Sequence, residues 1–221
     1  MATSKAAPAH DPLDHPALSE PVRALARRGV VKSYRKGALL IQEGDVGDTI
    51  FIILSGRLRA FSVSADGDRD ITYDSYGPGD YVGEMGLDGG PRSANVEALE
   101  ATVCAMVTRP TLAAHLAEQP QFAFELLTKV IQRARAATVR ARNMGLTDVY
   151  GRLKLLLHEL AVAQPDGSFL TTEWLTHKEL ASRLGCSREM VSRLLKDLER
   201  GGAIVVEPDH RLRWRRLPAG W

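Results

Sequence analysis

The chain has 221 residues, of which 44% are hydrophobic and 25% charged, and its net charge is +2. This is the composition of an ordinary globular protein with enough apolar residues for two compact domains, and it excludes a fibrous or wholly disordered chain. No apolar run approaches the roughly 18 residues that a membrane-spanning helix needs, and the opening sequence MATSKAAPAHDP lacks the apolar stretch of a signal peptide. We therefore expect a cytoplasmic protein that does not bind membranes.

The charge is unevenly distributed along the chain. Residues 1–108 contain eleven Lys and Arg against fifteen Asp and Glu, residues 109–146 six against two, and residues 147–221 twelve against ten. A basic C-terminal half is compatible with nucleic-acid binding, although the excess is small and a solvated helical face would look similar. The two cysteines, Cys104 and Cys186, are too few for a disulfide framework and are expected to be buried thiols.

The N-terminal half predicts a tail, a short helix and a small β-domain. Residues 1–17 are rich in Ala, Pro and His without periodicity, which is typical of a mobile tail. Residues 18–28 fit a short amphipathic helix that ends at Gly29. From residue 30 to residue 108, short apolar runs alternate with glycines, as in an antiparallel, jelly-roll-like β-roll. We place this sensor domain at residues 18–120.

A long helix is predicted from Phe122 to about Met144. Pro110 suits the first turn of a shorter helix that continues over residues 111–118, and Pro120 separates the two helices. The long helix has an apolar stripe with alternating spacings of four and three, as at the a and d positions of a coiled coil. The stripe consists of Ala123, Leu127, Val130, Ala134, Ala137, Ala141 and Met144. We expect a dimerisation helix over residues 121–145 and hence a homodimer; the alternative is that the stripe packs on its own domain.

Residues 146–221 predict a winged helix-turn-helix, so that the whole chain is of the α+β class. Gly145 is expected to close the long helix and Thr147 to cap the next one. The sequence THKE at residues 176–179 fits a capping box at a helix start. Gly185 can form the turn to a second helix over residues 188–200, which Ser187 caps. Two short strands, over residues 203–206 and 211–214, would form the wing.

The second of these helices has a polar face at its beginning. Arginine can donate two hydrogen bonds to guanine O6 and N7, and glutamate can accept from cytosine N4. Residues near the start of the second helix are those that reach the bases in this motif. The expected DNA contacts are Ser187, Arg188, Glu189, Ser192, Arg193 and Lys196. The alternative is a solvated charged face on a structural helix bundle.

The sequence GCSREMVSR at residues 185–193 closely resembles the recognition motif of the Crp/Fnr family of transcription regulators. The resemblance implies that Arg188, Glu189 and Arg193 read a TGTGA-like half-site, with Ser192 tuning the preference. A homodimer would then read the inverted repeat in double-stranded DNA. Such a protein is not an enzyme and is expected to act with RNA polymerase, as an activator or a repressor.

Residues 77–94 resemble the phosphate-binding cassette of cyclic-nucleotide-binding domains. The resemblance implies that Glu84 accepts from a ribose hydroxyl, that Arg92 neutralises a cyclic phosphate, and that Ser93 completes the anion site together with backbone amides. Arg133 matches a position near the cassette and can pair with Glu84. The expected ligand-binding residues are Gly83, Glu84, Met85, Arg92, Ser93, Ala94, Arg133 and Thr138.

The resemblance implies a cyclic nucleotide effector and no required cofactor. Cyclic AMP is expected first, with cyclic GMP and cyclic di-GMP as alternatives, because Thr138 keeps one of two hydroxyl positions used by cyclic-AMP-responsive members and Ala137 lacks the other. The span from Glu84 to Arg92 is also one or two residues shorter than in these relatives. A β-roll that binds no ligand and holds these two residues as an ordinary ion pair is therefore a further alternative.

Some other classes of function need metal ligands that the sequence lacks. None of the six histidines lies between residues 30 and 108, which excludes a cupin-type metal site. An iron–sulfur sensor needs a cysteine cluster near the N-terminus, and this class is excluded because the first cysteine is Cys104. A haem sensor that uses His10 or His15, and an interaction module without DNA binding, stay open. In the favoured hypothesis, an anionic ligand in the β-roll changes how the long helices pair and thereby sets the spacing of the two recognition helices.

Overall fold

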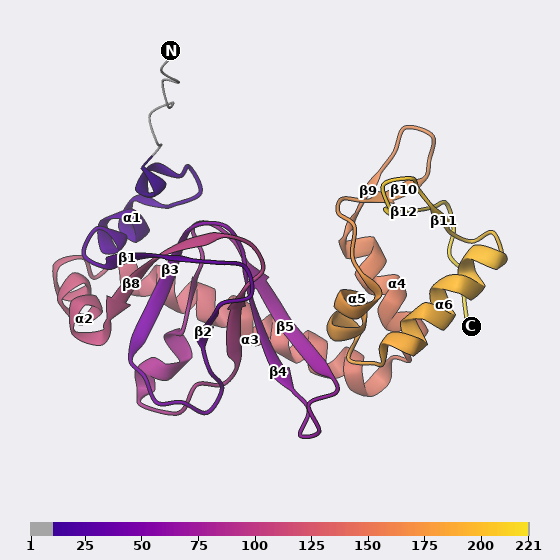
Figure 1. Ribbon diagram of the computed structural model, residues 1–221. Helices are drawn as coiled ribbons and strands as arrows, with labels where there is room; N and C mark the ends of the chain where they lie inside the picture. Colours follow the sequence, from indigo (N-terminus) through magenta and orange to yellow (C-terminus); the bar gives the residue numbers. More distant parts are fainter. Residues whose placement is uncertain (1–10, 221) are drawn as a thin grey trace, which may run out of the picture. The chain divides into compact units, whose positions relative to one another are not determined.

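The computed structural model describes residues 11–220, which form two compact units (Figure 1). One unit comprises residues 11–62 and 73–131, and the other comprises residues 63–72 and 132–220. Over the described range, no helix combines the length and the apolar character needed to cross a membrane. The α+β class expected from the sequence is confirmed.

Two four-stranded antiparallel sheets make up most of the first unit (Figure 1). One sheet has the strand order β1-β8-β3-β6 and the other has the order β2-β7-β4-β5. The strands are β1 (Val30–Tyr34), β2 (Leu39–Ile41), β3 (Thr49–Ser55), β4 (Leu58–Val63), β5 (Asp70–Tyr76), β6 (Tyr81–Val82), β7 (Asn95–Ala98) and β8 (Thr102–Thr108). This arrangement confirms the expected β-roll.

Strand β3 lies between β8 and β6 and is buried on both of its faces. Ile50, Ile52 and Leu54 point to one side, where they pack against helical residues, and Phe51 and Ile53 point to the other side, towards the second sheet. Alternate residues of a strand face opposite sides, so two cores require a continuous apolar run rather than an alternating one. The sequence IFIIL therefore reflects burial on both faces.

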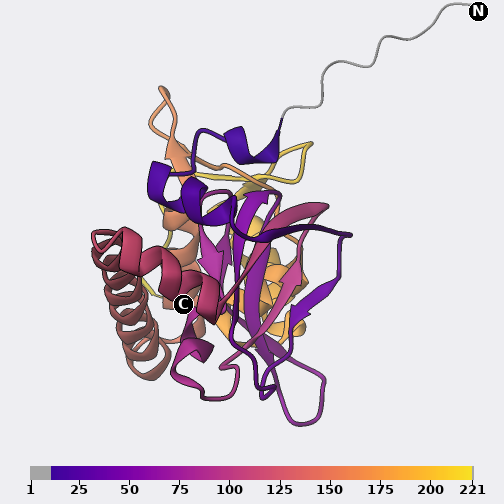
Figure 2. The ribbon, with the colours of Figure 1, turned by 90° about the vertical axis from the view of Figure 1, so that its left-hand side faces the viewer.

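Helices cover the outer face of the β1-β8-β3-β6 sheet. They are α1 (Glu20–Ala26), α2 (Arg109–Glu118) and the start of α3 (Phe122–Leu146), and Figure 2 shows the unit from this side. Leu25 of α1, Leu112 of α2 and Phe122 of α3 lie in one cluster with Ile50 and Ile52 of β3. Cap residues fix the helix starts: Ser19 accepts from the Val22 amide, and Thr108 accepts from the Thr111 amide ahead of Pro110.

The expected tail over residues 1–17 differs in extent from the structure. Residues 12–14 form a short 3₁₀ helix, η1 (Pro12–Asp14), and Leu13 packs at the edge of the helical cluster. The Arg23 side chain donates to the Leu13 carbonyl oxygen at 2.9 Å. The chain is therefore anchored from about residue 11, and residues 1–10 lie outside the described range.

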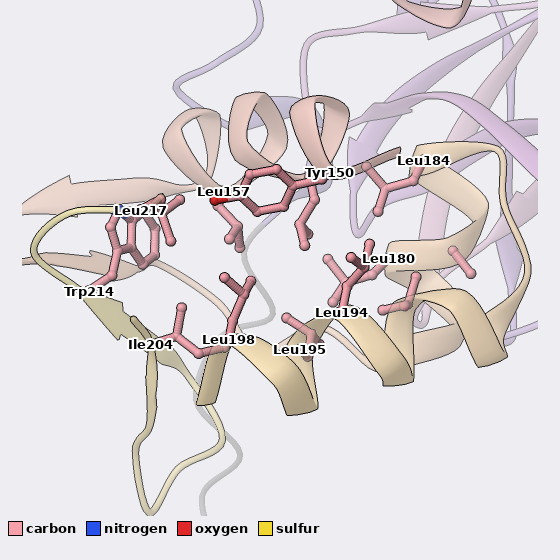
Figure 3. Packing of buried hydrophobic residues seen from close by; sticks show 13 residues of the cluster. Tyr150, Leu157, Leu180, Leu184, Leu194, Leu195, Leu198, Ile204, Trp214 and Leu217 are labelled. Atoms are coloured by element: carbon pink, nitrogen blue, oxygen red, sulfur yellow. The ribbon is translucent and has the colours of Figure 1, made fainter. Parts of the chain in front are cut away.

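The second unit contains the C-terminal helices and a four-stranded sheet of order β11-β12-β10-β9. Its helices are α4 (Val149–Glu159), α5 (His177–Leu184) and α6 (Arg188–Arg200), and its strands are β9 (Ala161–Ala163), β10 (Phe169–Thr171), β11 (Val205–Val206) and β12 (Leu212–Trp214). Figure 3 shows side chains of α4, α5, α6 and the sheet meeting in one apolar cluster, with Leu157, Leu180, Leu198 and Trp214 among them. This is the winged helix-turn-helix expected from the sequence.

The junction between α3 and α4 corrects two expectations. Gly145 does not close the long helix, which continues to Leu146. Thr147 is not the cap of α4, because Asp148 occupies that position and its carboxylate accepts from the Gly151 amide at 2.7 Å. Asp is as good a cap as Thr, and at this site it lies at the required spacing of three residues from the amide.

Candidate nucleic-acid interface and effector site

The start of α5 is fixed by the expected capping box. The Thr176 hydroxyl accepts from the Glu179 amide at 3.2 Å, and the Glu179 carboxylate accepts from the Thr176 amide at 2.7 Å. The two bonds satisfy backbone donors that a helix start otherwise leaves free. His177, the first residue of α5, therefore has a well-defined backbone position.

The turn between α5 and α6 uses a glycine in the left-handed conformation. Gly185 has φ 63°, and the Cys186 amide donates to the Ala181 carbonyl oxygen at 3.1 Å. Ser187 then caps α6, since its hydroxyl accepts from the Met190 amide at 3.2 Å. Arg152 of α4 donates to the carbonyl oxygens of Thr147 and Leu184 at 2.7 and 3.0 Å. This last contact, which the sequence analysis missed, fixes the end of α5 on α4.

Helix α6 separates an apolar face from a polar one. Val191, Leu194, Leu195 and Leu198 are buried in the core, while Arg188, Glu189, Arg193 and Lys196 are exposed and Ser192 is half-buried. Hydrogen bonds from its own backbone amide and from the Ser187 hydroxyl, together with the Arg188 charge, lower the pKa of Glu189. Glu189 is therefore a carboxylate acceptor at neutral pH.

One contact joins the polar face of α6 to α5. His177 Nδ1 lies 2.8 Å from the Ser192 hydroxyl oxygen. Both residues also line a cavity of about 320 Å³, together with Lys196, Trp174 of the loop before α5 and His210 of the wing turn. The sequence analysis missed this pairing because the two residues are fifteen positions apart and belong to different helices.

The wing is a hairpin between β11 and β12. Its turn contains His210 at φ 64°, a conformation that few non-glycine residues adopt. The Glu207 carboxylate forms an ion pair with Arg213, whose guanidinium also donates to the Ser168 hydroxyl at 2.9 Å. The hairpin is thus joined by side-chain bonds to the β9–β10 turn of the same sheet.

The cassette residues lie in the first unit around a short 3₁₀ helix, η2 (Glu84–Asp88). Gly83 precedes it with φ 92°. Glu84 is half-buried, Met85 and Ser93 are exposed, and Ala94 is half-buried. The Ser93 hydroxyl donates to the Met85 sulfur at 3.4 Å, so the two ends of the cassette are close together.

Arg92 points into the β-roll and is 7% exposed. Its guanidinium donates to the carbonyl oxygens of Gly83 and Thr49 at 2.6 and 2.8 Å. Space around it is small: a Cβ atom added at Gly47, Gly83 or Gly86 would lie within 3.0 Å of a guanidinium nitrogen. Burial lowers the pKa of Arg92, and the nearby charges of Asp48 and Glu84 oppose this effect.

The short span before Arg92 is held by backbone bonds to the β2–β3 loop. The Arg92 amide donates to the Asp45 carbonyl oxygen at 2.8 Å, and the Gly44 amide donates to the Arg92 carbonyl oxygen at 2.8 Å. Within the span, the Asp88 carboxylate accepts from the Gly90 amide at 2.8 Å. The eight-residue separation of Glu84 and Arg92 is therefore compatible with a regular, hydrogen-bonded loop.

The two remaining ligand candidates lie on α3. Arg133 is half-buried, and Thr138 is exposed with its hydroxyl donating to the Ala134 carbonyl oxygen of its own helix at 3.0 Å. These residues belong to the second compact unit and Glu84 to the first, so the predicted pair of Arg133 and Glu84 stays a prediction. Of the two tail histidines, His15 accepts from the Ala17 amide at 3.2 Å, whereas His10 lies outside the described residues.

Comparison with known proteins identifies both halves of the chain. Residues 31–119 match the family of cyclic nucleotide-binding domains, and residues 151–219 match the Crp-like helix-turn-helix domain. The CRP-like cAMP-activated global transcriptional regulator of Mycobacterium tuberculosis is 30% identical over 190 residues, which cover 84% of each chain. The cyclic AMP receptor protein of Thermus thermophilus is 31% identical over 176 residues, which cover 79% of each chain.

The fold is also found among solved structures. A c-di-GMP responsive global regulator of Xanthomonas campestris, CLP, has a TM-score of 0.77 at 22% identity, with 89% of this chain and 99% of that chain covered. The two domain matches, the order of the domains and the similarity over most of the chain agree with one another. The chain therefore belongs to the CRP/FNR family of DNA-binding transcription regulators, which are not enzymes, and has a cyclic nucleotide-binding domain followed by a Crp-like helix-turn-helix.

Proposed function

We propose that this chain is a cytoplasmic, homodimeric regulator that reads a TGTGA-like palindrome and responds to a cyclic nucleotide, cyclic AMP foremost. The observation that carries the proposal is the reading face of α6, where Arg188, Glu189 and Arg193 are exposed on a helix with a fixed start. Each good pair between such a side chain and a base discriminates by about 1–3 kcal/mol. Ser187 and Lys196 would support these contacts from either end of the face.

The exposed stripe on α3 supports a homodimer. Leu127 is 56% exposed and Val130 44% exposed, and Ala134, Ala137 and Ala141 continue the exposed stripe along the helix. Large exposed apolar side chains in a heptad pattern are expected to be covered by a second helix. Because a twofold axis makes the same surface meet itself, a second copy of α3 is the simplest partner.

The cassette fits an anionic ligand in part. A guanidinium has five N–H donors, and the bonds of Arg92 to the Gly83 and Thr49 carbonyl oxygens leave other donors for a phosphate oxygen. Glu84, Ser93 and the backbone around Gly83 and Met85 would hold the remainder of a cyclic nucleotide, and Arg133 and Thr138 would contact it from α3. The two relatives named for cyclic AMP support this effector first.

In the proposed mechanism, ligand binding is coupled to DNA binding through α3. A bound nucleotide would favour one pairing of the two α3 helices, and this pairing would set the spacing of the two α6 helices. Half-sites in a palindrome lie about 34 Å apart, one turn of DNA, so a small rotation aligns or misaligns both reading faces. Contact with RNA polymerase would then make the bound regulator an activator or a repressor.

The DNA-reading part is tested by a gel-shift titration of the full chain with a TGTGA/TCACA palindrome. Arg188→Ala and Arg193→Ala are expected to weaken specific binding by about tenfold or more. Arg200→Ala is the matched control, because Arg200 is exposed at the far end of the same helix, and it should retain the preference for the palindrome. Equal binding of the wild type and both arginine variants to every sequence would contradict the proposal.

The effector part is tested by calorimetry with cyclic AMP, cyclic GMP and cyclic di-GMP on the full chain. Cyclic AMP should bind the wild type and bind less tightly to Glu84→Gln and Ser93→Ala. Preferential binding of cyclic di-GMP would replace cyclic AMP as the effector. Absence of measurable binding of all three compounds would favour a regulator whose β-roll acts without a nucleotide.

A further inference from the structure

We propose that His177 determines which bases Ser192 can read. In this arrangement His177 Nδ1 accepts a hydrogen bond from the Ser192 hydroxyl, so the serine offers only acceptor lone pairs to the DNA and selects adenine or cytosine at the base it faces. The inference rests on the proposed reading function and adds to it a specificity-determining pair. His177 is the positioning residue, and Ser192 is the residue that touches the base.

The geometry of the pair is well defined from both sides. The capping box of Thr176 and Glu179 fixes the backbone at His177, and the buried neighbour Val191 fixes the backbone at Ser192. The distance of 2.8 Å between Nδ1 and the hydroxyl oxygen is that of a good hydrogen bond. His177 is exposed and Ser192 is half-buried beside the exposed Glu189 and Arg193, so the pair lies within the reading face.

The direction of the hydrogen bond follows from the surroundings that DNA provides. A neutral imidazole has one N–H, and the bond made by one ring nitrogen sets the role of the other. Phosphate oxygens are the commonest polar partners at a protein–DNA interface, and they only accept. Next to DNA, the exposed ring of His177 is therefore favoured with its proton on Nε2, which leaves Nδ1 as the acceptor.

The base preference follows from the inventory of a hydroxyl group, which has one donor and two acceptor positions. With its proton held by His177, Ser192 can only accept from the base. In the major groove, adenine N6 and cytosine N4 carry N–H groups, whereas the polar atoms of guanine and thymine only accept. A serine without the histidine could rotate its hydroxyl to suit any of the four bases. The hydrogen bond to His177 thus makes Ser192 selective for bases that carry an N–H donor.

The test is a binding titration of the full chain, with and without cyclic AMP, on a set of palindromes in which each position of the half-site carries each of the four base pairs. At one position where Ser192→Ala shows no preference, the wild type should bind the two base pairs that place adenine or cytosine on the same strand about tenfold more tightly than the two pairs that place thymine or guanine there. His177→Ala should reduce this preference below about twofold while leaving the preferences due to Arg188 and Arg193 in place.

Three further variants separate positioning from a general loss of structure. His177→Asn should restore the preference, because its amide oxygen can accept a hydrogen bond from the Ser192 hydroxyl. In a Ser192→Ala background, His177→Ala should change nothing further at that position, as expected when one residue acts through the other. Lys178→Ala, an exposed neighbour on α5, is the matched control and should bind as the wild type does.

The outcomes distinguish this inference from the proposed function. A preference at the Ser192 position for purine over pyrimidine on one strand, or for A·T pairs over G·C pairs in both orientations, overturns the inference alone, as does an undiminished preference in His177→Ala. Absence of discrimination at every position in the wild type overturns the reading function and the inference with it. Loss of the preference in His177→Ala with recovery in His177→Asn supports the inference.

Discussion

Arg92 donates hydrogen bonds to two backbone carbonyl oxygens within the β-roll. A buried charged donor contributes about 1.5–3 kcal/mol for each bond, and its loss leaves the acceptors unpaired. We predict that Arg92→Gln lowers the free energy of unfolding by about 3 kcal/mol in the absence of any ligand. Urea denaturation followed by circular dichroism measures this change in the free energy of unfolding. Ser93→Ala, at the exposed neighbour, is the control, and equal stability of both variants would show that Arg92 does not support the fold.

His115 is a fully buried histidine of α2 whose ring packs edge-on against Phe122 at 5.2 Å. Burial and the charge of Arg28 lower its pKa, although Glu118 and the Pro21 backbone oppose this. The protonated form is thus disfavoured in the folded state, and unfolding takes up a proton. The stabilisation is complete above the unfolded pKa of about 6.5 and is lost as the pH falls through the lower folded pKa.

A pH series of thermal unfolding tests this account of His115. Between about pH 7.5 and pH 5.5 the wild type should lose more stability than His115→Leu, because only the wild type must keep this imidazole neutral. The difference between the two stability curves is the informative quantity, since every other titrating group is common to both proteins. A constant difference across the range would contradict the assignment.

Among the elements, the turn between α5 and α6 depends on the left-handed conformation of Gly185. An added Cβ would lie 2.5 Å from the Met144 methyl group, and an L-residue in this conformation costs about 1–2 kcal/mol. Gly185→Ala should therefore lower the thermal stability of the C-terminal unit and weaken DNA binding. Gly167→Ala is a useful comparison because it has φ 78° with open space around it. A larger stability loss at Gly167 than at Gly185 would contradict the role of the Met144 contact.

The elements also show how far the sequence could predict the structure. The bounds of α6 and the capping box of α5 were predicted correctly, because caps and a strong apolar periodicity are local signals. Gly145 misled the prediction of the helix end, since a glycine can continue a helix as well as stop one. Strand β9 was missed because three residues carry too little pattern. The inward orientation of Arg92 depends on carbonyl oxygens supplied by Thr49 and Gly83, which only the folded chain brings together.

The whole molecule is expected to be a dimer because the α3 stripe is exposed in a single chain. Leu127→Glu places a charge at the a position of the stripe and should convert the protein into a monomer. Gln132→Glu is the matched control, because Gln132 is exposed on the opposite side of the heptad. Sedimentation velocity distinguishes the two states. A dimeric Leu127→Glu variant would show that the stripe is not the interface.

In the proposed homodimer, pairing of two reading faces would supply the selectivity for one DNA sequence. One α6 helix would contact a single half-site, and two α6 helices related by a twofold axis would contact both halves of a palindrome. Because the specific contacts of the two halves act together, a discrimination of at least about 10³-fold over unrelated DNA is expected. Because the net charge is only +2, we expect non-specific electrostatic binding to DNA to be weak compared with specific binding.

The most direct test is a fluorescence anisotropy titration of the full chain at fixed salt, with and without cyclic AMP. The two DNA duplexes are a TGTGA/TCACA palindrome and a duplex of the same length and composition with both half-sites scrambled. The account predicts binding to the palindrome at least about 10³-fold tighter than to the scrambled duplex, with cyclic AMP increasing the difference. Equal affinity for the two duplexes under both conditions would contradict it.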